Sequence, residues 1–255
     1  MLLLSAALAL LTAVGSATAE VLQKGNLRVS VLSRIQPFKL PRHGTAPIAV
    51  FVGGHIGTTD GQVPPQLETM TIDVNRHGLL QSQGLPVCPI SAIKASSTGR
   101  SLRRCGDALV GSGRFWASVV FPAQRPYPTR GRLLIFNGRA GGKPALFAHI
   151  FTTVPFATSF VIVFSIRSIH KGPYGTELKA SLPGALGSWG FVDRIKLTLR
   201  RKYTYRGKAL SYFNSGCPAL AKADTAVFPL ARAKFQFVDG KEMSLNVTKS
   251  CRVDE

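Results

Sequence analysis

The uncharged stretch "PALFAHIFTTVPFATSFVIVFSI" (144–166) constrains the fold of this chain more than any other segment. A run of about 20 apolar residues can cross a bilayer as a helix. The composition favours strands instead, because Phe, Val, Thr and Ile dominate the stretch and fit a pleated sheet better than a helix. Pro155 also biases the preceding residue towards an extended backbone. We therefore expect two strands, at 145–154 and 159–167, buried on both faces, with a membrane helix as the alternative.

Turn signals recur along the chain at spacings that are typical of short strands. Asp60-Gly61 follows the apolar segment 47–56, and Asp239-Gly240 lies inside the alternating segment 233–247, which reads as a hairpin. No segment shows a convincing apolar period of 3.6 residues. The sequence therefore predicts an all-β protein with one or two antiparallel β-sandwich domains of Greek-key or jelly-roll type.

A proline- and arginine-rich segment, "FPAQRPYPTRGR" (121–132), is the best candidate for a linker. It would separate an N-terminal β domain (20–122) from a C-terminal β domain (130–255). The two segments could also form one continuous body.

The N-terminus has the pattern of a signal peptide (1–19). Residues 2–14 form an apolar run, and small residues follow it up to "ATA" at 17–19. An uncleaved anchor is the alternative. With cleavage, we expect a secreted or extracytoplasmic protein, associated with the cell envelope, with no transmembrane helix in the mature chain.

The four cysteines agree with export. Four cysteines allow three pairings, and the simplest joins neighbours in the sequence: Cys88 with Cys105, and Cys217 with Cys251. Such bridges persist in oxidising compartments, and each would stabilise the fold by about 3–4 kcal/mol.

The formal net charge is +20, and one segment concentrates it: "RIKLTLRRKYTYRGK" (194–208). In an extended chain, alternate side chains share a face. Six cations would then lie on one face, namely Arg194, Lys196, Arg200, Lys202, Arg206 and Lys208. Such a row predicts a polyanion-binding surface for an anionic envelope polymer, an acidic polysaccharide or anionic lipid head groups. Nucleic acid is not expected as the ligand, because it does not fit the compartment and the sequence has no nucleic-acid-binding motif. The alternative is an ordinary solvated strand face.

Residues with catalytic potential are few and scattered. The segment "GRAGGKP" (138–144) lacks the spacing of a phosphate loop and reads as a turn. We expect His149 in the core with a backbone partner. His55 and Asp60 flank a turn, and we expect ordinary loop residues there, with a shared site as the alternative. Tyr174 and Trp189, close to glycines, could stack on a sugar ring, although simple packing is favoured.

No motif in the sequence predicts a catalytic site, a metal or a cofactor. The pattern favours a non-catalytic binding or structural protein of the cell envelope. An extracellular hydrolase or glycan-processing enzyme, with a site assembled from distant residues, is the alternative.

Overall fold

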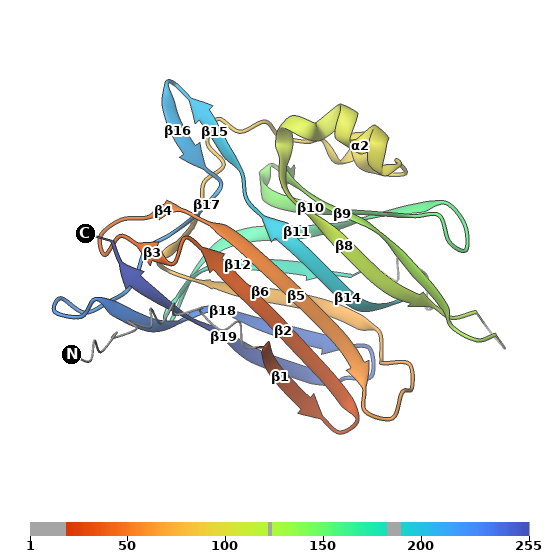
Figure 1. Ribbon diagram of the computed structural model, residues 1–255. Coiled ribbons are helices and arrows are strands. Elements are labelled where there is room, and N and C mark those ends of the chain that lie inside the picture. Colours follow the sequence, from red (N-terminus) through yellow and green to blue (C-terminus); the bar gives the residue numbers. More distant parts are fainter. Residues whose placement is uncertain (1–18, 122–123, 183–189, 255) are drawn as a thin grey trace, which may run out of the picture.

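The computed structural model describes residues 19–121, 124–182 and 190–254, and most of this chain is β-strand (Figure 1). The all-β prediction is therefore confirmed. The predicted signal peptide lies outside the described residues except for Ala19. In the described residues, the main sheet has 13 strands in the order β1 (Ala19–Lys24), β2 (Leu27–Gln36), β5 (Ala49–Thr58), β14 (Gly190–Leu199), β8 (Leu109–Val119), β9 (Tyr127–Ala140), β10 (Lys143–Thr152), β11 (Thr158–Lys171), β12 (Tyr174–Ser181), β6 (Leu67–Asn75), β18 (Thr225–Phe237), β19 (Glu242–Val253) and β3 (Lys39–Leu40).

This sheet is curled, and β1 at one end lies against β19 near the other end. The Glu20 carboxylate on β1 accepts hydrogen bonds from the backbone N–H of Thr248 (3.1 Å) and from Lys249 Nζ (3.4 Å) on β19. Side chains of β2, such as Val29, pack in one cluster with those of β18 and β19, such as Phe235. The core therefore lies on the inner face of one curled sheet, and not between the two stacked sheets of the predicted sandwich. Turn signals mark where strands end, but they do not show whether the next strand continues the same sheet or begins a second one.

Strands from the two halves of the chain are interleaved in this sheet. β14 lies between β5 and β8, and β6 lies between β12 and β18. The segment 121–132 begins in the connection that follows β8 and continues into the first six residues of β9, and β8 and β9 are paired neighbours. The described residues of 20–122 and 130–255 thus contribute strands to one sheet and side chains to one inner cluster, such as Ile35 and Leu230.

The uncharged stretch forms the hairpin β10–β11, which confirms the two expected strands, but β11 is only partly buried and not buried on both faces as expected. β10 is buried on both faces: Leu146 and Ala148 join the inner core, whereas Ala145 and Phe147 join a cluster on the outer face. In the parts of the chain that the structure describes, no helix is long and apolar enough to span a membrane.

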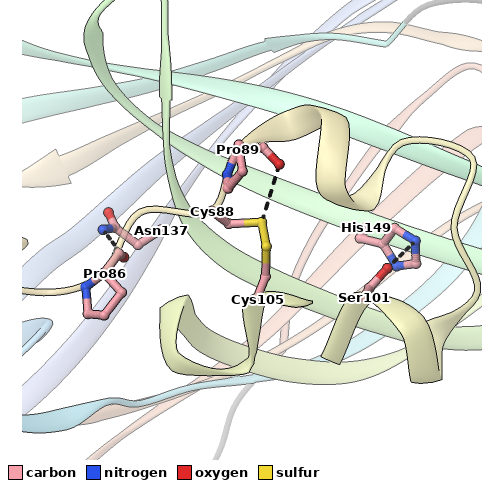
Figure 2. The surroundings of a disulfide bond; sticks show 7 residues. All are labelled: Pro86, Cys88, Pro89, Ser101, Cys105, Asn137 and His149. Carbon is pink, nitrogen blue, oxygen red and sulfur yellow. Dashed lines mark hydrogen bonds between the residues drawn. A yellow bond between two sulfur atoms is a disulfide. The ribbon is translucent and has the colours of Figure 1, made fainter. Parts of the chain in front are cut away.

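A helical segment (86–108) covers the outer face of β9 and β10. It contains α1 (Ile90–Ile93), α2 (Thr98–Cys105) and the 3-10 turn η1 (Gly106–Ala108). Asn137 of β9 donates to the carbonyl of Pro86 (2.9 Å), and the Cys88–Cys105 disulfide closes the segment, as Figure 2 shows. The second disulfide, Cys217–Cys251, is buried in the inner core. Both predicted pairings are confirmed.

Two small sheets complete the end of the molecule at which α2 lies. One contains β4 (Ala46–Pro47), β17 (Phe213–Ser215) and β7 (Gly78–Leu80); the other is the hairpin of β15 (Lys202–Tyr205) and β16 (Lys208–Ser211). This hairpin projects from the body beside the helical segment (Figure 1). The predicted turns are also found: Gly141-Gly142 joins β9 to β10 and Asp239-Gly240 joins β18 to β19, and each of these glycines has a positive φ.

Candidate functional site

The cationic segment 194–208 is not one strand. β14 ends at Leu199, and β15 begins at Lys202 in a separate sheet. Arg201, which lies between these two strands, donates to the carbonyl of Asp107 (3.0 Å). All six predicted cations are exposed, but only Arg194 and Lys196 lie on the main sheet. The other four lie on the connection or the hairpin, namely Arg200, Lys202, Arg206 and Lys208.

Arg194 and Lys196 are joined by cations from the two neighbouring strands. Lys196 is the register partner of Arg114 on β8, which is the partner of Arg132 on β9. In the next row, Arg194 is opposite Trp116, which is opposite Arg130. All five cations are exposed on the face turned away from the core, and we call them the outer basic face: Arg114, Arg130, Arg132, Arg194 and Lys196.

Sequence reasoning missed three members of this face. Arg130 and Arg132 do show the period of two that places them together on one strand face. Their meeting with Arg114 and Lys196, however, depends on the order and register of three strands that are distant in the sequence.

Like charges lie opposite one another on the outer basic face. Directly opposed side chains in an antiparallel pair lie about 5 Å apart, and like charges there destabilise the sheet. Among the described residues, none of its five cations forms an ion pair. The seven neighbouring strands from β2 to β11 contain one acidic residue, Asp193.

In the opposite part of the sheet, cations form ion pairs with carboxylates on neighbouring strands. There, Arg167 pairs with Glu177 (2.6 Å) and Arg232 pairs with Asp73 (2.6 Å), and these four residues lie in one cross-strand row. Burial raises the pKa of Asp73, but hydrogen bonds from Lys234 and Arg232 outweigh it and hold this pKa below its usual value. The fold can therefore match cations with carboxylates, and it does not do so on the outer basic face.

Asp193 lies at a β-bulge of β14, directly before Arg194. Ser118 Oγ donates to its carboxylate (2.9 Å). Burial raises the pKa of Asp193, against the effects of the Ser118 hydrogen bond and the nearby His55 and Arg194. The serine is thus bonded to the acid and not to a histidine, which is not the arrangement of an activated nucleophile.

The other candidate residues have structural roles. His149 is fully buried, and its Nε2 lies 2.8 Å from the Ser96 carbonyl oxygen and 3.2 Å from Ser101 Oγ (Figure 2), so the expected core position with a backbone partner is confirmed. Burial lowers the pKa of His149. Asp60 accepts from Asn26 (3.0 Å) and from the backbone of Gln62 (3.1 Å) in a turn. Tyr174 is buried and donates to Asn246, whereas Trp189 lies outside the described residues.

Two cavities stand out in the described part of the molecule, and neither is lined by Asp, Glu or His. The inner one, of about 60 Å³, is lined mainly by apolar side chains such as Phe115, Ile150 and Phe160. The other, of about 380 Å³, lies between residues 82–87 and the end of β9. The described residues also hold no group of three or more His, Cys, Asp or Glu that could bind a metal ion.

Comparison with known proteins finds no matching family model, no matching curated protein and no matching solved structure.

Proposed function

We propose that this is an exported, non-catalytic binding protein that holds a polyanion of the cell envelope on its outer basic face. One observation carries the proposal: Lys196, Arg114 and Arg132 are successive register partners on three adjacent strands, and all three are exposed and form no ion pair with any described residue. The two disulfides support an oxidising compartment, where polyanions include anionic polymers, acidic polysaccharides and lipid head groups.

The geometry suits a ligand that lies across the strands. Neighbouring strands are about 4.8 Å apart, and same-face residues along one strand are about 7 Å apart. A chain with anionic groups at similar intervals would neutralise several cations at once and remove the repulsion between them. At 0.1–0.15 M salt, the attraction between charges is screened beyond about 8–10 Å, and this distance shortens as salt is added. The binding should therefore weaken as ionic strength rises.

Two variants of equal charge test the proposal. The face variant carries Lys196→Gln, Arg114→Gln and Arg132→Gln, and the matched control carries Lys202→Gln, Arg206→Gln and Lys208→Gln on the β15–β16 hairpin. On an immobilised anionic polymer, we expect the face variant to elute at a clearly lower salt concentration than wild type, and the control to elute close to wild type. Equal losses in both variants would mean that net charge alone governs binding, and would contradict the proposal.

The hydrolase alternative is not favoured by any contact among the described residues. Ser118 directs its proton at Asp193, and the Ser101–His149 contact is fully buried, where no substrate reaches it.

A further inference from the structure

We infer that the ligand of the outer basic face is an acidic polysaccharide, and that Trp116 is the platform on which a sugar ring of this polymer stacks. This inference rests on the proposed function and names its ligand class. Two cross-strand rows on β14, β8 and β9 hold the five cations, and Trp116 is the sixth residue of these rows.

Trp116 lies between two arginines. Arg194 is its register partner on β14, and Arg130 is its register partner on β9. The indole is half-buried on the outer face, so one part of it is fixed by the sheet and another part is open to solvent. A sugar ring that covers the open part would lie between two arginine side chains, whose Cβ atoms are each about 5 Å from that of Trp116. Each guanidinium can hold a carboxylate with two parallel hydrogen bonds.

Asp193 favours a ligand that carries hydroxyl groups in addition to negative charge. It lies beside Arg194 at the bulge, and it is bonded to Ser118, the outer-face residue of β8 that follows Trp116. A carboxylate repels polyphosphate and phospholipid head groups and offers nothing to their oxygens, which are acceptors. It can accept hydrogen bonds from sugar hydroxyls. A polymer that carries both carboxylates and hydroxyl groups therefore satisfies the arginines and Asp193 together.

Single-stranded nucleic acid also combines rings with negative charge, and its bases stack on aromatic side chains. The two disulfides favour the polysaccharide, since they indicate a compartment in which polysaccharides are the abundant ring-containing polyanions.

Tryptophan fluorescence tests stacking directly. The chain has two tryptophans, so a Trp189→Phe background leaves Trp116 as the single reporter. Oligogalacturonate is the probe, and inorganic polyphosphate, phosphatidylglycerol vesicles and single-stranded DNA are the comparisons. We expect saturable emission changes with oligogalacturonate and none with polyphosphate. A response to DNA or vesicles at lower concentration than to oligogalacturonate would overturn the assignment.

Two substitutions separate stacking and hydroxyl recognition from simple charge. Trp116→Ala should weaken oligogalacturonate binding about tenfold, as loss of a stacked ring does, with polyphosphate binding little changed, and Trp116→Phe should recover much of the loss. Asp193→Asn removes one negative charge, so it should strengthen polyphosphate binding while it weakens oligogalacturonate binding. Thermal unfolding of each variant verifies that the fold is intact.

The outcomes also separate this inference from the proposed function. Stronger binding of both probes by Asp193→Asn, or no effect of Trp116→Ala, would overturn the polysaccharide and leave a general polyanion site. Failure of every probe to bind the wild-type chain at low salt would overturn the proposed function itself.

Discussion

Gly113 of β8 faces the inner side of the sheet at a point where β14 comes unusually close. A Cβ atom added at Gly113 would lie 2.0 Å from the backbone carbonyl oxygen of Lys196. Gly113 and Leu197 are register partners, and the next pair is Arg114 with Lys196. Close contact between the two backbones on the inner side therefore fixes the register that brings these two cations together on the outer side.

A Gly113→Ala substitution should destabilise the protein by about 1–3 kcal/mol, because backbone must move to admit the methyl group. Gly106→Ala is the matched control, since the space around a Cβ there is open and its φ is −56°. The free energy of unfolding in urea gives both values. A cost for Gly113→Ala no larger than that of the control would show that the two strands can separate freely.

The disulfide Cys88–Cys105 should matter most for the helical segment 86–108. Its replacement by Cys88→Ala and Cys105→Ala should cost about 3 kcal/mol, because a 17-residue loop in the unfolded chain is no longer closed. Hydrogen exchange should then rise first in α2, because the bridge ties this helix to Cys88, whose backbone N–H donates to the carbonyl of Asn137 in β9. If hydrogen exchange rose evenly throughout the sheet while exchange in α2 stayed the same, the bridge would have no local role.

His149 should make stability depend on pH. Burial lowers its pKa in the folded protein below 6.5, so the folded state favours the neutral imidazole. The unfolded chain takes up this proton first as pH falls below about 6.5, and stability is lost from there down to the folded pKa, by at most about 1.4 kcal/mol per pH unit. His149→Gln keeps an N–H that can reach the Ser96 carbonyl, but its amide does not titrate. This variant should therefore lose the pH-dependent contribution to stability. Thermal unfolding at pH 8 and pH 5 compares the two chains, and an identical pH dependence would contradict the prediction.

Local patterns predicted much of the fold. The β-branched and aromatic composition of 144–166 identified β10 and β11, and Asp-Gly and Gly-Gly pairs identified turns. The spacing of the cysteines suggested both disulfides. Each of these features depends on residues close together in the sequence or on a simple choice among few pairings.

The sheet order could not be predicted in this way. Nothing local shows that β14 inserts between β5 and β8, or that β14 ends at Leu199 and β15 begins in a separate sheet at Lys202. The candidate site was therefore found only in part: Arg194 and Lys196 were identified, but Arg114, Arg130 and Arg132 join them through strand register. Gly138 illustrates the same limit. It was expected in the turn 138–144, yet it lies within β9, where the Phe147 ring occupies the place that its Cβ would take.

The most direct measurement is the salt dependence of polyanion binding by the wild-type chain and the face variant with Lys196→Gln, Arg114→Gln and Arg132→Gln. The logarithm of the binding constant should fall linearly with the logarithm of salt concentration, with a slope that counts the ionic contacts. We predict that the face variant lowers the magnitude of this slope by about 2–3, and that the hairpin control leaves it unchanged. Equal slopes for wild type and the face variant would contradict a binding role for the outer basic face.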